Sequence, residues 1–254
     1  MPKWMASAVF ALVATMAGAC LLERTARADE GHVDLLLVLA ADVSRSVDET
    51  KFRLQREGYA AAITDPRVVS AMMAGPHRRI AVCYIEWASD REQKVVIDWT
   101  AIGGEGEAQL VAERLRREHR SFWGRTSISA AIDYSMAYLH TSPFKATRRV
   151  IDVSGDGTNN SGRDVTLARD AAVAQGVTIN GLVILSQVPL PTNPYHTHPL
   201  GGLTAYYENN VAGGPGAFVV EAQGFETFGQ SIIGKLIKEI ADAGPLGAGP
   251  TSTE

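Results

Sequence analysis

The chain has 254 residues, of which 46% are hydrophobic and 20% are charged, and its formal net charge at pH 7 is −4. This length suits one α/β domain of about 200 residues with short extensions. The negative charge argues against a nucleic-acid-binding protein or a protein that binds anionic lipid, because both functions need a basic surface.

The amino terminus differs in kind from the rest of the chain. A basic start at Lys3 precedes an apolar run over residues 5–22, and an A-x-A sequence ends at Ala28. This order is typical of a secretory signal peptide, although the run also approaches the length of a retained anchor helix. We expect residues 1–28 to be a signal peptide, the protein to be exported to the bacterial periplasm or secreted, and the mature chain to have no membrane span.

Apolar runs and amphipathic stretches alternate along the remainder. Residues 33–41 are almost continuously apolar, which predicts a central strand that is buried on both faces. Ser46 and Glu49 have the spacing of a capping box and predict a helix over residues 47–63, which Asp65-Pro66 ends. Further strands are expected at 78–88, 93–102, 149–153, 177–185 and 217–222, and further helices at 105–118, 127–139, 164–175, 203–211 and 225–243.

Strands that alternate with helices predict a doubly wound α/β fold. Residues 78–88 and 93–102 are joined by a short polar turn, which favours a hairpin. We therefore expect a mostly parallel sheet with one antiparallel strand at its edge and helices on both faces. This domain would cover residues 29–243, and residues 244–254 would form a flexible tail.

Oxygen-bearing side chains follow two of the expected strands. Asp42, Ser44 and Ser46 form a D-x-S-x-S sequence directly after the first strand, and Asp156 follows the strand at 149–153. Thr126 precedes the helix at 127–139. The carboxyl ends of parallel strands meet at one rim of a sheet, and carboxylates and hydroxyls are ligands that suit Mg²⁺. Taken singly, Ser46 and Thr126 can also be helix caps, and Asp156-Gly157 can be a turn.

Together these residues resemble the metal-ion-dependent adhesion site of the von Willebrand factor A (vWA) family. The family motif is D-x-S-x-S, then a lone threonine, then an aspartate often followed by glycine, and the likeness extends over residues 33–243. More narrowly, the segments at 213–219 and 235–240 are similar to a secreted bacterial vWA-like group of unknown function. One departure is Gly155, where many members of the wider family have threonine.

The resemblance implies both a cofactor and a function. Asp42, Ser44, Ser46, Thr126 and Asp156 would hold Mg²⁺ or Mn²⁺, the hydroxyls directly and the aspartates often through water. The ion would bind an Asp or Glu carboxylate of a protein partner, which makes the protein an exported, adhesion-type binding domain. One alternative is a metal-independent scaffold whose site is vestigial.

A metal-dependent hydrolase is the other alternative. Such an enzyme needs a general base beside the ion, but no histidine is adjacent in sequence to any ligand segment, and the nearest other carboxylates are Asp48 and Asp152. Ser44 occupies the second position of what would be a D-x-D phosphatase motif. We therefore expect a protein that is not an enzyme.

The polar, proline-rich stretch 186–202 follows a strand parallel to the first, so we expect it at the same rim as Asp42. Tyr195, His196 and His198 are the predicted partner contacts in this loop. Two alternatives for the histidines are a second metal site and simple exposure to solvent.

Overall fold

A computed structural model describes residues 31–241 of the chain. The expected signal peptide at residues 1–28 and the expected tail at residues 244–254 lie outside the described residues. Within the described part, none of the helices combines the length and the apolar character needed to cross a membrane.

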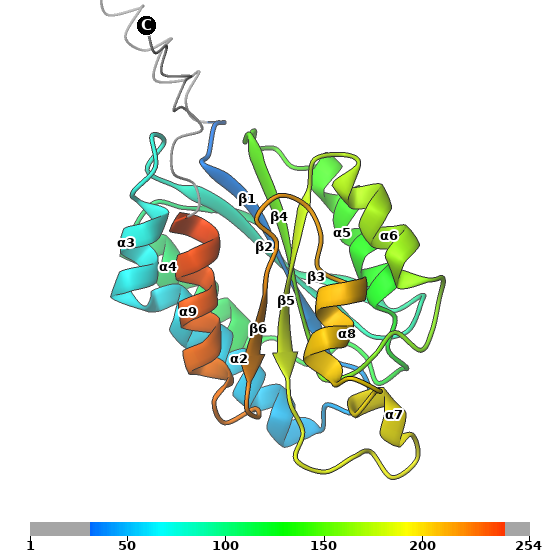
Figure 1. Cartoon of the computed structure of the whole chain (residues 1–254). Coiled ribbons are helices and arrows are strands. Elements are labelled where there is room, and N and C mark those ends of the chain that lie inside the picture. Colours follow the sequence, from blue (N-terminus) through cyan, green and yellow to red (C-terminus); the bar gives the residue numbers. More distant parts are fainter. Residues whose placement is uncertain (1–30, 242–254) are drawn as a thin grey trace, which may run out of the picture. The chain divides into compact units, whose positions relative to one another are not determined.

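The described strands form one sheet with the order β3-β2-β1-β4-β5-β6 (Figure 1). The β2–β3 pair is antiparallel, and every other neighbouring pair in this sheet is parallel. The predicted α/β fold with one antiparallel edge strand is therefore confirmed. The strands are β1 Leu35–Asp42, β2 Ile80–Trp87, β3 Gln93–Ile102, β4 Arg148–Gly155, β5 Thr178–Ile184 and β6 Val219–Ala222.

Helices cover both faces of the sheet, as expected (Figure 1). One face carries α2 Glu49–Thr64, α3 Pro66–Met72, α4 Glu105–Arg117 and α9 Phe228–Ala241. The other face carries α5 Ile128–His140, α6 Val165–Val173 and α8 Leu203–Asn210, and the short α7 Pro194–Thr197 lies in the loop between β5 and α8.

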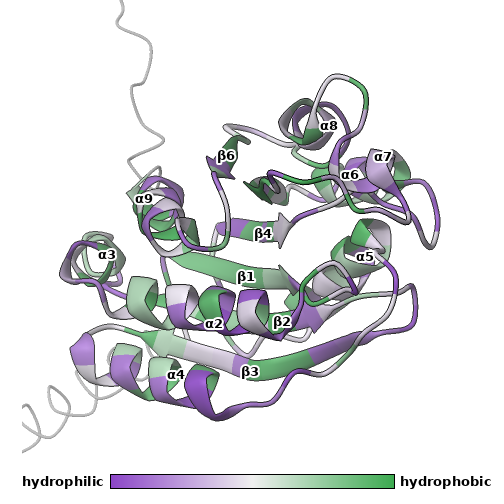
Figure 2. Cartoon of the chain, turned by 90° about the horizontal axis from the view of Figure 1, so that it is seen from below, coloured by the Kyte–Doolittle hydropathy of each residue, from purple (hydrophilic) through white to green (hydrophobic). Residues whose placement is uncertain are grey.

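The apolar run of β1 explains its central position. All eight of its residues are buried, and Figure 2 shows the hydrophobic colour along most of the strand. Successive side chains of a strand point to opposite faces. Leu35, Leu37 and Leu39 accordingly belong to the core beneath α2 and α9, while Leu36 and Val38 belong to the core beneath α5 and α8. Each such side chain contributes about 1.5–3 kcal/mol by leaving water.

The capping box expected at Ser46 does not form, and the alternative in which Thr126 caps a helix is wrong. Asp48 is the N-cap of α2 and accepts a hydrogen bond from the Lys51 backbone N–H at 2.9 Å, so the helix begins two residues later than predicted. Ser127 caps α5 in the same way. The hydroxyls of Ser46 and Thr126 are therefore not used in capping.

The break at Asp65-Pro66 is confirmed, but a helix that we did not predict follows it. Asp65 ends α2 and also caps α3, where its side chain accepts from the Arg67 backbone N–H at 2.9 Å. Pro66 occupies the start of the new helix, where a missing N–H costs nothing. At seven residues, α3 is too short to give a clear periodic pattern.

Three neighbouring parallel strands end at the same rim of the sheet. Asp42 is the last residue of β1, Gly155 the last of β4 and Ile184 the last of β5. The loops that follow these strands meet at the lower end of the sheet in Figure 1. This rim is where open parallel sheets usually place their sites.

Candidate metal centre

Side-chain oxygens from three segments converge at this rim. Asp42 is fully buried, and its Oδ1 accepts a hydrogen bond of 2.6 Å from the Ser44 backbone N–H. Ser46 Oγ donates to Asp156 Oδ1 at 2.6 Å and lies 3.2 Å from Ser44 Oγ. Thr126 Oγ1 donates to Ser44 Oγ at 3.0 Å. We call these five residues the oxygen cluster, and the structure brings together every side chain that the sequence nominated as a ligand.

Two carboxylate oxygens in the oxygen cluster lack a hydrogen-bond partner. They are Asp42 Oδ2 and Asp156 Oδ2, and both are buried. Burial, followed by the charge of Asp156, raises the pKa of Asp42 from its ordinary 3.8 to about 8, against hydrogen bonds from Ser44 and the charge of Arg120. A buried polar atom without a partner is costly. A divalent cation bound by these residues would remove that cost, so the residues fit a metal ion.

The chemistry of the cluster also limits which ion it suits. Three hydroxyls and two carboxylates supply oxygen donors only, which favours Mg²⁺ or Mn²⁺ over softer metals. Within residues 31–241, no group of three or more His, Cys, Asp or Glu side chains is arranged to hold a metal. Any ion at this rim therefore depends on the serine and threonine hydroxyls.

Two basic residues stabilise the loop between Asp42 and α2. The Arg120 guanidinium donates to the Ser44 backbone oxygen at 2.8 Å, and also to the backbone oxygens of Val43 and Val47. Lys51 Nζ donates to the Ser46 backbone oxygen at 2.8 Å and lies 3.7 Å from Asp156 Oδ2. The sequence analysis missed both residues, because a basic side chain near a helix end has many structural uses.

The structure also places His196 against the oxygen cluster. Its ring is buried, and Nε2 lies 3.2 Å from Thr126 Oγ1. Asn160 Oδ1 accepts from the Thr126 backbone N–H at 3.0 Å, which leaves the Asn160 amide nitrogen facing His196 Nδ1 at 3.2 Å. In this network Nδ1 is the acceptor, so Nε2 carries the proton and donates to Thr126. Burial lowers the pKa of His196, consistent with a neutral ring.

The other two predicted partner contacts lie at the surface. Tyr195 is 70% exposed, and His198 is also exposed. His198 Nδ1 lies 3.0 Å from Thr197 Oγ1, whereas His196 faces Thr126. The loop after β5 therefore borders the oxygen cluster through one buried histidine. The idea that His196 is merely solvent-exposed is wrong.

Two glycines, Gly155 at the end of β4 and Gly157 just after it, make room for neighbouring side chains. A Cβ at Gly155 would lie 2.6 Å from Tyr207 Oη and 3.1 Å from Asp42 Oδ2, and a Cβ at Gly157 would lie 2.2 Å from ring atoms of His196. Tyr207 of α8 thus fills the space that a threonine at position 155 would need. The departure from the wider family motif at Gly155 has a steric cause.

We expect Gly155→Thr to destabilise the protein by about 1–3 kcal/mol, because the added side chain meets a packed hydroxyl. Denaturant unfolding of Gly155→Thr, Tyr207→Phe and the double variant would measure this. Since Tyr207→Phe removes only the crowding oxygen, part of the loss should be recovered in the double variant. Strictly additive effects would contradict the steric explanation.

The two other carboxylates nearest in sequence to the ligand segments, Asp48 and Asp152, have other partners. Asp48 caps α2 and is exposed. Asp152 is buried within β4 and lies 2.6 Å from Lys235 Nζ. Each therefore has a structural role of its own.

Solved structures share this arrangement of sheet, helices and rim. A vWA protein from Catenulispora acidiphila matches 83% of the chain at 12% identity with a TM-score of 0.54, covering 43% of that protein. The mussel byssus protein PTMP1, in a structure described with a zinc-occupied MIDAS motif, matches 84% at 12% identity with a TM-score of 0.56, covering 48% of it. The pilus adhesin SpaC from Lactobacillus rhamnosus GG matches 82% at 14% identity with a TM-score of 0.58, covering 31% of it.

At these identities the likeness establishes the fold, which is that of a vWA domain. The chain spans less than half the length of these three proteins. By sequence, residues 32–244 match the family described as "Protein of unknown function (DUF1194)", and the chain belongs to that family. No curated protein matches it by sequence.

Proposed function

We propose that this chain is an exported protein-binding domain that uses Mg²⁺ or Mn²⁺ to bind an acidic residue of a protein partner. The oxygen cluster of Asp42, Ser44, Ser46, Thr126 and Asp156 would hold the ion. The observation that carries the proposal is the pair of buried carboxylate oxygens without hydrogen-bond partners, set among three hydroxyls at one rim. A structural set of caps and turns would not leave these atoms unsatisfied.

The hydroxyl and carboxylate residues of the oxygen cluster would have different roles in binding the ion. Ser44, Ser46 and Thr126 offer neutral hydroxyl oxygens, and Asp42 and Asp156 offer charge. When bound, the ion would supply a coordination position for one further carboxylate. Arg120 hydrogen-bonds to the Ser44 backbone oxygen and keeps the loop after β1 ordered before the ion binds. Ion binding therefore does not carry the entropic cost of ordering this loop.

Three further features support the proposal. The structure of PTMP1 is described with a metal in its MIDAS motif, and SpaC is described as a pilus adhesin. The exposed Tyr195 and His198 stand on the loop whose His196 contacts the cluster, which suits them to contact a partner. Export is proposed from the basic, apolar and A-x-A pattern of residues 1–28.

Metal-dependent capture tests the function. The chain would be immobilised and exposed to periplasmic extract with Mg²⁺, with EDTA, and with an Asp156→Ala variant as the matched control. We expect a defined protein that elutes with EDTA and does not bind the variant, and whose binding is lost when one of its own acidic residues is changed to the amide. Capture that is equal under all three conditions would favour a metal-independent scaffold.

We expect His196→Ala to weaken Mn²⁺ binding by about tenfold, as is usual when a side chain that orients a ligand is removed. The imidazole fixes the direction of the Thr126 hydroxyl, so its loss frees that ligand. Calorimetry would measure the affinity, and His198→Ala, on the exposed part of the same loop, is the control. An unchanged affinity in His196→Ala would show that Thr126 needs no such support.

A further inference from the structure

Two exposed arginines flank the opening over the oxygen cluster. A cavity of about 150 Å³ lies there, lined by Ser46 and Thr126 of the cluster and by Arg45, Arg125 and His196. Within residues 31–241, neither guanidinium takes part in a hydrogen bond or an ion pair. No acidic side chain lines this cavity. An anion that enters it therefore meets two cations that no neighbour neutralises.

The opening continues along the rim as two further cavities. A second cavity of about 230 Å³ shares Ser46 and Leu190 with the first and also contacts Asp156. A third of about 360 Å³ shares Lys51 and Val188 with the second. Because each cavity shares walls with the next, we treat the three as one feature, the rim groove.

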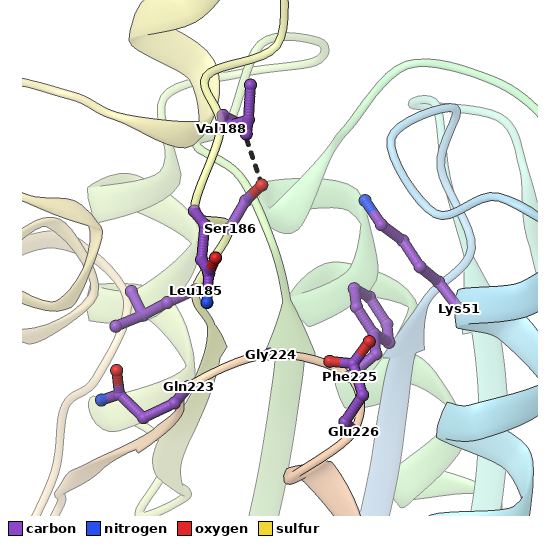
Figure 3. A pocket seen from close by; sticks show the side chains of 9 residues that line it. Lys51, Leu185, Ser186, Val188, Gln223, Gly224, Phe225 and Glu226 are labelled. Atoms are coloured by element: carbon purple, nitrogen blue, oxygen red, sulfur yellow. Dashed lines mark hydrogen bonds between the residues drawn. The ribbon is translucent and has the colours of Figure 1, made fainter.

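The far end of the rim groove combines apolar side chains, Leu185, Val188 and Phe225, with polar ones. Figure 3 shows Lys51 reaching from α2 on one side, Leu185 and Val188 after β5 on the other, and Phe225 and Glu226 below. Val188 is 70% exposed, and Lys51 Nζ lies 5.4 Å from the centre of the Phe225 ring. An apolar side chain placed here would cover the exposed Val188 and contact the part of the otherwise buried Phe225 that borders the cavity.

The rim groove is lined by several basic residues, although the chain as a whole is acidic. The whole chain carries a formal charge of −4, but the groove has Arg45 and Arg125 at its first cavity and Lys51 between the second and third. Its acidic lining residues are Asp156, which belongs to the oxygen cluster, and Glu226 at the far end. The occupant that complements this pattern is anionic near the cluster and apolar away from it.

We propose that the rim groove binds an extended acidic segment of a protein partner. One carboxylate of the segment reaches the oxygen cluster, a second acidic residue beside it lies between Arg45 and Arg125, and an apolar side chain packs against Val188 and Phe225. This inference rests on the proposed function, because the first carboxylate needs the ion. Beyond that function, the inference requires at least two neighbouring acidic residues in the partner segment for recognition.

A peptide fits this groove better than a nucleic acid does. A phosphate backbone carries charge along its whole length, and at the far end it would meet Glu226, Leu185 and Val188. A peptide can place charge at one end and an apolar side chain at the other. Capture of nucleic acid in place of peptide would overturn the proposal.

A random peptide library displayed on phage and selected on the immobilised chain in Mn²⁺ tests it. We expect the enriched peptides to carry neighbouring acidic residues followed or preceded by an apolar residue, and EDTA to release them. An enriched peptide would then be synthesised in two forms, one intact and one with a single acidic residue left. For the intact form, the double variant Arg45→Ala/Arg125→Ala should bind about tenfold more weakly than the wild type, because two charged contacts are lost.

The controls separate this inference from the proposed function. The single-acid peptide should bind the wild type and the double variant equally, Mn²⁺ affinity should be unchanged, and Arg117→Ala on the exposed face of α4 should have no effect. If single-acid peptides bind as tightly as the intact form and still need the metal, the proposed role of the rim groove is wrong, while the proposed metal site is retained. If EDTA does not release the acidic peptides, the proposed metal dependence is wrong, while the proposed role of the rim groove is retained. Failure to enrich acidic peptides would overturn both.

Discussion

Replacing Lys235 with methionine is expected to destabilise the protein by about 3–5 kcal/mol, the usual result of removing one partner from a buried charge cluster. Lys235 is fully buried in α9, where its Nζ lies 2.6 Å from Asp152 Oδ1 and also pairs with Glu239. Asn180 donates to Glu239 Oε1 at 2.8 Å. Methionine would leave two buried carboxylates without a cation.

The stability lost in Lys235→Met should increase as the pH rises. Burial, followed by Glu239, raises the pKa of Asp152 from 3.8 to about 7, and Lys235 opposes the shift. The folded state therefore binds a proton at Asp152 more tightly than the unfolded state does. The free energy of unfolding that this protonation contributes is fully present below pH 3.8 and is lost as the pH rises through 7. Without Lys235 the carboxylate is harder still to ionise.

Urea unfolding at pH 5 and pH 8 would measure the effect of Lys235→Met. Lys238→Met, a change on the exposed side of the same helix, is the matched control and should alter stability little. Adding Asp152→Asn to Lys235→Met should restore part of the stability, because one buried charge is removed. Equal destabilisation at the two pH values would contradict this account of the cluster.

Replacing Asp42 with asparagine is expected to stabilise the metal-free protein at pH 7 by about 1–3 kcal/mol, the cost of a buried polar group without a partner. Asparagine keeps the oxygen that accepts from the Ser44 N–H and removes the charge. With a pKa of about 8 in place of 3.8, Asp42 favours the folded state only while it is protonated. The wild type should therefore lose stability as pH rises from about 4 to 8 in EDTA, and the variant should lose less.

Thermal unfolding in EDTA and then in Mn²⁺ would test this prediction. The wild type should gain stability with Mn²⁺ because the ion binds only the folded state, while Asp42→Asn should gain nothing. Asp48→Asn, in the same loop but exposed, should behave like the wild type because asparagine caps a helix as well as aspartate does. An Asp42→Asn protein that is less stable than the wild type in EDTA would show that the carboxylate has a structural use.

Much of the fold could be predicted because its signals are local. The apolar run of β1 and the polar turn before β3 each lie within a few residues, and Gln93–Ile102 was predicted to the residue. The five residues of the oxygen cluster could be nominated because each lies next to the end of a strand or the start of a helix. Topology then brings them to one rim.

Contacts between distant segments could not be predicted. His196 meets Thr126 across 70 positions, and Arg120 reaches Ser44 across 76. Tyr207 crowds Gly155 from α8, which lies about 50 positions further along the chain and packs on a face of the sheet. The local sequence around Ser46 even favoured a cap, and only the nearby Asp156 shows why its hydroxyl is used elsewhere.

The most direct test of the metal site is calorimetric titration of Mg²⁺ and Mn²⁺ into the EDTA-treated protein, beside Asp42→Ala and Asp156→Ala. We predict saturable binding of one ion per chain to the wild type and loss of that binding in both variants, because each removes a buried carboxylate from the oxygen cluster. A wild type that takes up neither ion, or variants that bind as tightly as it does, would contradict the account.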